Sequence, residues 1–220
     1  MGALVAMAAA TILLGDSQGE VLAGRLRACA PGLVVGVKSG RPIAQVLAAA
    51  KALPAATRSS ATHVWVTGGG NDGASPNTAA ARELVDLFPA GVVVWVAPPP
   101  AATIANLAHA KAVFGSNVKT ANHWFTNGTA ASRETCAAKL RQAVDGYHGA
   151  RWLDVRQLVQ PYPAQPDGIH MAGATADKVA AALCAGESRS WASSWVPWAA
   201  LGGLALIAVA AWRVHRRGIS

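Results

Sequence analysis

Short apolar runs alternate along this chain with Ala-rich segments, and this alternation limits the fold more than any other feature. The apolar runs are Thr11–Leu14, Leu33–Val37, His63–Thr67, Val92–Ala97 and Trp152–Val155. They are continuous rather than alternating with polar residues, which is typical of parallel strands buried on both faces. Segments with helical composition lie between and after them, at about 18–30, 41–53, 77–88, 101–112, 132–146 and 174–185. This order predicts a flavodoxin-like, three-layer α/β sandwich with a central parallel sheet of about five strands.

The end of the sequence has a different character. Residues 195–212 carry no charged side chain, and Trp195, Trp198 and Trp212 mark the two ends of the segment. As a helix it would be roughly 27 Å long, close to the hydrocarbon thickness of a bilayer, and tryptophans favour the membrane interface. We therefore expect a folded domain over 1–186, a linker over 187–194, a transmembrane helix over 195–212 and a basic tail over 213–220. A buried core helix is the alternative for the apolar segment.

The cellular location of the domain is predicted from the two ends of the chain. The apolar N-terminus has no Lys or Arg ahead of it and runs directly into Gly15, so we interpret residues 4–14 as a lead-in and a buried strand, not a signal peptide. The basic residues after residue 212 favour a cytoplasmic C-terminus. We expect a chain anchored by a single C-terminal helix, with the domain outside the cytoplasm. A tail-anchored cytoplasmic domain and a protein carried in a virus particle are the alternatives.

The charge and the cysteine content limit the partners and metal ions that this chain is expected to bind. A net charge of +8 fits affinity for anionic polymers or lipid head groups. No clustered basic stripe is present, so nucleic-acid binding is not expected. The three cysteines, Cys29, Cys136 and Cys184, form no CxxC pair, which argues against zinc. One disulfide with a free thiol and three buried thiols both fit the sequence. Nothing in it indicates an oligomeric state.

Four polar motifs fall where predicted strands end or where the last predicted helix begins. They are Gly15-Asp16-Ser17-Gln18, Lys38-Ser39-Gly40, Gly69-Gly70-Asn71-Asp72 and Asp167-Gly168-Ile169-His170. The carboxyl ends of parallel strands meet at one edge of the sheet, where sites form. Each motif alone has an ordinary explanation as a helix cap, a turn or a loop.

Together the motifs contain what nucleophilic catalysis needs. A serine in a strand-to-helix turn is exposed near helix N–H groups. A histidine can take the serine proton, and a carboxylate can orient that histidine. A backbone N–H beside a glycine and an asparagine amide are suitable donors to a developing oxyanion.

The order and spacing of these motifs resemble the SGNH/GDSL hydrolase family, and the resemblance covers residues 11–185. It implies Ser17 as nucleophile, His170 as base and Asp167 as the partner of His170. It also implies an oxyanion hole made of the Ser17 N–H, the Gly40 N–H and the Asn71 side chain. No metal or organic cofactor is expected in a site of this kind.

The resemblance implies a serine esterase that works through an acyl-enzyme. We expect its substrate to be an acyl group, mainly O-acetyl, on a cell-envelope or surface polysaccharide. A lysophospholipase or thioesterase acting beside the membrane is the alternative enzyme, and a membrane-tethered structural protein that retains the fold is the alternative from another class. His123 and Trp124 lie in a polar and aromatic segment and are candidates for binding substrate, with a structural loop as the alternative.

Overall fold

The computed structural model of the protein describes residues 9–100, 106–114 and 130–193. Contacts divide the chain into Met1–Cys184 and Ala185–Ser220, and the first unit contains the sheet. Five parallel strands form it in the order β2-β1-β3-β4-β5. They are β1 (Ala10–Gly15), β2 (Val34–Val37), β3 (Ala61–Thr67), β4 (Val92–Val96) and β5 (Arg151–Leu153). The predicted five-stranded parallel α/β sandwich is confirmed.

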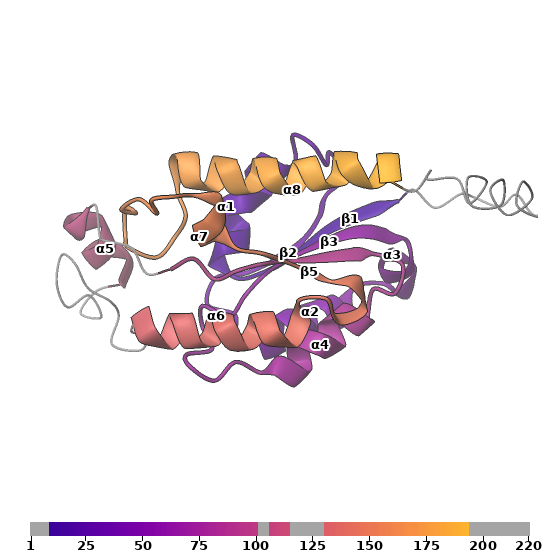
Figure 1. Cartoon of the computed structure of the whole chain (residues 1–220), viewed down its shortest axis with the longest axis horizontal. Helices are drawn as coiled ribbons and strands as arrows, with labels where there is room; N and C mark the ends of the chain where they lie inside the picture. The colour runs from indigo at the N-terminus through magenta and orange to yellow at the C-terminus, as the bar shows by residue number, and fades with distance from the viewer. Residues whose placement is uncertain (1–8, 101–105, 115–129, 194–220) are drawn as a thin grey trace, which may run out of the picture. The chain divides into compact units, whose positions relative to one another are not determined.

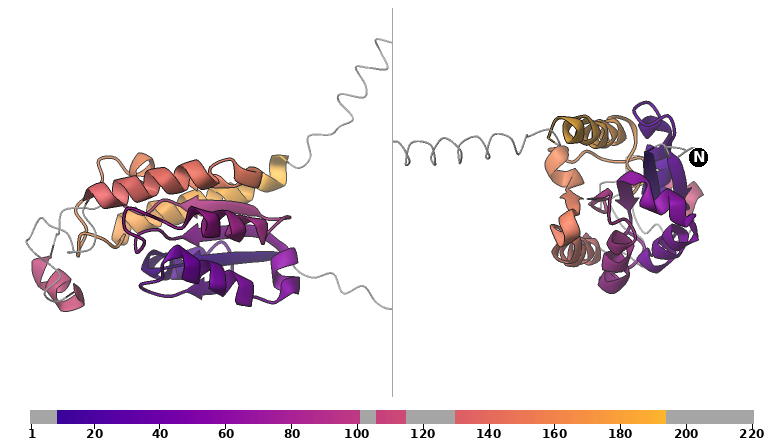
Figure 2. Two further views of the ribbon diagram at one scale, coloured as in Figure 1. Left: turned by 90° about the horizontal axis from the view of Figure 1, so that it is seen from below. Right: turned by 90° about the vertical axis from the view of Figure 1, so that its right-hand side faces the viewer.

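Helices cover both faces of this sheet (Figures 1 and 2). The longer ones are α1 (Ser17–Leu26), α2 (Ile43–Ala52), α4 (Thr78–Asp86), α5 (Leu107–Phe114), α6 (Ala130–Val144) and α8 (Gly173–Ser193). The short ones are α3 (Ala55–Ser59), η2 (Tyr147–Gly149) and α7 (Val155–Leu158). Helices α1 and α8 pack on one face, and α2, α4 and α6 pack on the other (Figure 1).

The interior strand β1 shows why the apolar runs are continuous. Leu13 packs with Leu22 of α1 and Leu183 of α8. Its neighbours Ile12 and Leu14 belong to the core on the opposite face. All three are fully buried. Successive side chains of a strand point to opposite faces, so a sheet covered on both sides needs apolar residues at consecutive positions.

The cysteine alternatives are decided by the structure. Cys29, just after α1, and Cys184, in α8, form a disulfide that joins residues 155 positions apart. Cys136 on α6 is a free, buried thiol that lies 3.0 Å from the Gly69 carbonyl oxygen. Burial raises the pKa of that thiol to about 12, so it stays protonated.

Several boundaries differ from the predicted ones. Helices α3 and α7 were not predicted, because elements of five and four residues are too short to show a periodic pattern. Helix α8 continues to Ser193, through most of the segment 187–194 that we expected to be a linker. Gly186 disfavours a helix only weakly, and the next proline along the chain is Pro197.

Within the ranges described, no helix is both long and apolar enough to cross a bilayer. The predicted transmembrane segment 195–212 and the basic tail 213–220 lie outside those ranges.

Candidate active site

The turn between β1 and α1 presents Ser17 at the carboxyl edge of the sheet. Asp16 caps α1, and its Oδ1 accepts the Gln18 N–H at 3.0 Å. Gly15 has φ +151°, and a Cβ at this position would lie 2.0 Å from Thr67 Oγ1 on β3. Only glycine fits such a close approach. The Gly-Asp-Ser sequence therefore builds a tight turn that leaves Ser17 as the first residue of the helix.

The loop before α8 supplies the histidine. Asp167 Oδ1 accepts two backbone N–H groups, from Ile169 at 2.9 Å and from His170 at 2.8 Å. These bonds fold the loop around the carboxylate, which is only 4% exposed. The second carboxylate oxygen remains directed at the imidazole.

Ser17, His170 and Asp167 form a continuous hydrogen-bonded line. His170 Nε2 lies 2.8 Å from Ser17 Oγ, and His170 Nδ1 lies 2.6 Å from Asp167 Oδ2. Burial raises the pKa of Asp167, but hydrogen bonds from the His170 side chain and from two backbone N–H groups lower it by more, to about 2. The carboxylate is therefore charged at any pH near neutrality and can hold a proton on Nδ1.

Asn71 and Gly40 follow the two strands that flank β1. The Asn71 amide nitrogen donates to Asp16 Oδ2 at 3.4 Å and to the Arg41 carbonyl at 3.2 Å. Gly40 lies in an exposed turn with φ +77°. Glu20 of α1 holds that turn, since its carboxylate accepts the Ser39 N–H at 2.8 Å and the Ser39 hydroxyl at 2.6 Å. Both segments are thus attached to the turn and helix that carry Ser17.

A buried cation lies near Asp16, the residue before Ser17. Arg133 of α6 is 9% exposed and donates to the Pro99 carbonyl at 3.4 Å. Burial lowers the pKa of its guanidinium, and the Asp16 carboxylate offsets part of that effect. Burial likewise raises the pKa of Asp16, which the Gln18 N–H offsets in part. Asp16 and Arg133 therefore favour the charged form of each other.

A groove of about 410 Å³ opens beside His170, between α1, α5 and the loop before α8. Glu20, Arg25 and His109 are the polar side chains that line it together with Asp167 and His170. Arg25 is fixed by an ion pair with Asp177 of α8 at 2.6 Å. The groove thus reaches Asp167 and His170 from a side that carries charged and polar groups.

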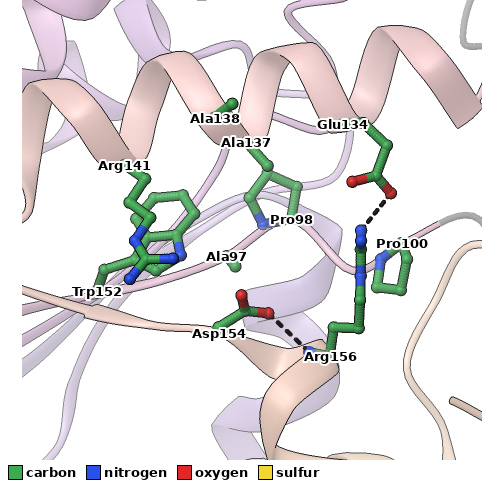
Figure 3. Close-up of a pocket in the computed structure, with 10 residues that line it drawn as sticks. All are labelled: Ala97, Pro98, Pro100, Glu134, Ala137, Ala138, Arg141, Trp152, Asp154 and Arg156. Carbon is green, nitrogen blue, oxygen red and sulfur yellow. Dashed lines mark hydrogen bonds and ion pairs between the residues drawn. The ribbon is translucent and has the colours of Figure 1, made fainter. Parts of the chain in front are cut away.

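A second cavity, of about 200 Å³, lies between α6 and the β5–α7 segment (Figure 3). Its charged side chains are directed at partners within the protein. Arg156 pairs with Glu134, and the Asp154 carboxylate accepts the Arg156 N–H at 2.9 Å (Figure 3). Ser17, Asp167 and His170 do not line this cavity.

The predicted site residues thus fall into three groups. Ser17, Asp167 and His170 are brought into hydrogen-bonding contact. Gly40 and Asn71 lie in the two loops attached to the Ser17 turn. His123 and Trp124 lie outside the described residues. Gln18 and Arg133 were not predicted, because a single polar residue on a helix carries no signal of its tertiary partner.

Comparison with known proteins finds the same fold at low sequence identity. No family model and no curated sequence matches the chain. An alpha/beta hydrolase enzyme from the metagenome of Lake Arreo, Spain, is 15% identical, with a TM-score of 0.56, over 81% of this chain and 94% of that one. A GDSL-like lipase from Bacteroides thetaiotaomicron VPI-5482 is 15% identical, with a TM-score of 0.54, over 83% and 89%.

A mutant of an acetyl-xylooligosaccharide esterase from Geobacillus stearmophilus is also similar. It is 13% identical, with a TM-score of 0.52, over 80% of this chain and 92% of that one. These likenesses show the fold alone. The chain has the fold of the SGNH/GDSL hydrolases.

Proposed function

We propose that this chain is a serine esterase that hydrolyses acyl, mainly O-acetyl, esters on a cell-envelope or surface polysaccharide. The observation that carries the proposal is the line of hydrogen bonds from Ser17 Oγ to His170 Nε2 at 2.8 Å and from His170 Nδ1 to Asp167 Oδ2 at 2.6 Å. A nucleophile, a base and an orienting carboxylate in this order are what acyl transfer through serine requires.

In the first half of the reaction, Ser17 Oγ attacks the ester carbonyl carbon and its proton moves to His170 Nε2. The imidazolium is stabilised by the Asp167 carboxylate, which accepts a hydrogen bond from Nδ1–H. The tetrahedral intermediate then expels the alcohol, which takes the proton from Nε2, and an acyl-Ser17 ester remains. In the second half, water attacks the carbonyl carbon of that ester and gives a proton to His170 Nε2. The second tetrahedral intermediate then expels Ser17 Oγ, which takes the proton from Nε2, and the carboxylic acid is released.

The oxyanion of both intermediates needs donors, which we assign to the Ser17 N–H, the Gly40 N–H and the Asn71 amide. The Asn71 amide already donates to Asp16 and to the Arg41 carbonyl. The Asp16 contact is the longer of the two, so it is the one that a developing negative charge would replace. A donor held in place before the reaction needs little reorganisation when the charge forms.

The groove beside His170 supports a carbohydrate as the alcohol part of the ester. Glu20, Arg25 and His109 line it, and an alkyl chain lying over them would remove them from water without offering hydrogen bonds. Sugar hydroxyls can form such bonds. The acetyl-xylooligosaccharide esterase described above has a substrate of this kind, although its likeness to this chain extends to the fold alone.

We expect full-length protein to hydrolyse p-nitrophenyl acetate with a kcat/KM at least about tenfold higher than p-nitrophenyl palmitate, because a long alkyl chain over the polar side chains of the groove would leave them without hydrogen bonds. The reverse preference would favour the lysophospholipase or thioesterase alternative, which the apolar segment 195–212 suggests. No hydrolysis of either ester would favour a structural protein that retains the fold.

We further propose that residues 195–212 anchor the chain and that the domain lies outside the cytoplasm. The Cys29–Cys184 disulfide supports this location, because disulfides persist mainly in oxidising compartments. In phase partitioning with a detergent, the full-length chain should enter the detergent phase and a chain ending at Ser188 should stay in the aqueous phase. Equal partitioning of the two would contradict the anchor.

A further inference from the structure

The residue after the nucleophile, Gln18, contacts the loop that carries the histidine. Its Nε2 donates to the Ile169 carbonyl at 3.1 Å, and its Oε1 accepts the Met171 N–H at 3.1 Å. Ile169 and Met171 are the two neighbours of His170 in the chain. Both ends of a single amide group therefore bond to the backbone on either side of the histidine.

These contacts are shielded from water. Gln18 is 6% exposed, and Met171 is fully buried. Loss of a buried partner leaves a backbone group without a hydrogen bond, which costs more than the bond itself contributes. We therefore expect both hydrogen bonds of the Gln18 amide to persist in the folded protein.

The other bonds of this loop are mostly internal to it. Asp167 accepts the N–H groups of Ile169 and His170. Gln165 accepts the Ala172 N–H at 3.0 Å and donates to Thr175 Oγ1 at 3.2 Å. Asp167 and Gln165 shape the loop, whereas Gln18 attaches it to α1 directly beside Ser17.

We propose that Gln18 is a positioning residue that sets the distance between His170 Nε2 and Ser17 Oγ. Ser17 and Gln18 are consecutive at the start of α1, so fixing the Gln18 side chain to Ile169 and Met171 fixes the nucleophile relative to the base. The proposal rests on the proposed esterase function. Gln18 contacts the loop backbone, so it acts through His170.

The amide group is specific for this role. Glutamine is the side chain of this length that offers a donor to the Ile169 carbonyl and an acceptor to the Met171 N–H at the same time. Gln18→Glu keeps size and shape but has no proton for the Ile169 carbonyl when ionised. Gln18→Met keeps length and offers neither strong bond. The two variants separate packing from hydrogen bonding.

The test compares both variants with wild type on p-nitrophenyl acetate, using full-length protein. We expect kcat to fall about 10- to 100-fold in each, because a displacement of about 1 Å between reacting groups has an effect of that size. KM should change less than about threefold, since no substrate contact is lost. The amide hydrogen of Met171 should exchange with deuterium roughly tenfold faster in Gln18→Met, where it loses its acceptor.

Arg82→Met is the matched control. Arg82 of α4 donates to the Ala143 carbonyl of α6 at 3.0 Å, so this variant also replaces a long polar side chain that bonds to the backbone of another element. It should lower the thermal unfolding temperature without changing kcat or the exchange of Met171. An equal loss of kcat in Arg82→Met would show that general destabilisation explains the effect.

The outcomes distinguish a failure of the Gln18 proposal from a failure of the esterase proposal. Unchanged kcat and unchanged Met171 exchange in both variants overturn the positioning role while the esterase stands. If wild type shows no Ser17-dependent hydrolysis, the esterase proposal fails and Met171 exchange alone decides whether Gln18 holds the loop. If Gln18→Met does not fold, kcat and KM of Gln18→Glu decide, since that variant loses the donor to the Ile169 carbonyl.

Discussion

Replacing Ser17 by alanine is expected to lower kcat on p-nitrophenyl acetate by about 10⁴- to 10⁶-fold, the range seen when the nucleophile of a serine enzyme is removed. Ser17 Oγ lies 2.8 Å from His170 Nε2, so the variant removes both the attacking atom and the group that the base acts on. The fold should persist, because the cap of α1 is formed by Asp16. The measurement is the initial rate, with thermal unfolding recorded on the same sample.

Ser59→Ala is the control for this variant. Ser59 is an exposed serine of α3 that bonds only to its own helix at Ala56, and its loss should leave the rate unchanged. A rate in Ser17→Ala equal to wild type would remove Ser17 as the nucleophile.

Asn71→Ala provides a graded comparison, since loss of one oxyanion donor should lower kcat by about 10²–10³ with little change in KM. A change in KM alone would mean that Asn71 binds substrate instead.

Asp167→Asn is expected to lower kcat by about 10⁴-fold with the fold retained. Asp167 Oδ1 accepts the N–H groups of Ile169 and His170, so an asparagine must keep its oxygen there. Its NH₂ group then faces His170 Nδ1 and requires that nitrogen to be an acceptor. The imidazole proton is placed on Nε2, facing Ser17, where the ring can no longer accept the serine proton.

The pH profile checks the same variant. The pKa of Asp167 is lowered to about 2, so its charge stabilises the folded state fully above about pH 4 and is lost as the pH falls towards 2. Between pH 5 and 9 that charge is constant. An acid-side loss of wild-type activity in this range therefore does not come from Asp167.

Asp154→Asn is the control for the Asp167→Asn variant. Asp154→Asn changes a carboxylate that caps α7 away from the triad and should match wild type at each pH. If Asp167→Asn also matches wild type from pH 5 to 9, Asp167 is a turn residue only. Ser17 and His170 would then act as a dyad.

The sequence predicted those features that leave a repeating or local pattern. Five continuous apolar runs gave the five strands, because burial on both faces demands them. The Gly-Asp-Ser and Asp-Gly-Ile-His motifs indicated the triad, because turn geometry and chemistry are both local there. Neither feature depends on which distant residues meet.

Contacts between distant polar side chains could not be predicted in this way. Gln18 reaches Ile169 and Met171 across more than 150 positions, and its neighbours in sequence give no indication of that. Arg133 lies in an Ala-rich helix whose exposed face also carries charges, so its burial depends on how α6 packs. The pairing of Cys29 with Cys184 likewise follows from the packing of α1 against α8, and no spacing in the sequence selects it.

The disulfide also determines how the domain would transmit tension. A pull on residues 185–220 enters the folded unit at Cys184, and the covalent bond passes it directly to Cys29. Ser17 begins α1, and Cys29 follows the end of that helix. The covalent path along which such a pull would reach Ser17 therefore runs through the sulfur atoms and along α1. The residues between Cys29 and Cys184, with β2 to β5 among them, form a closed covalent loop beside this path.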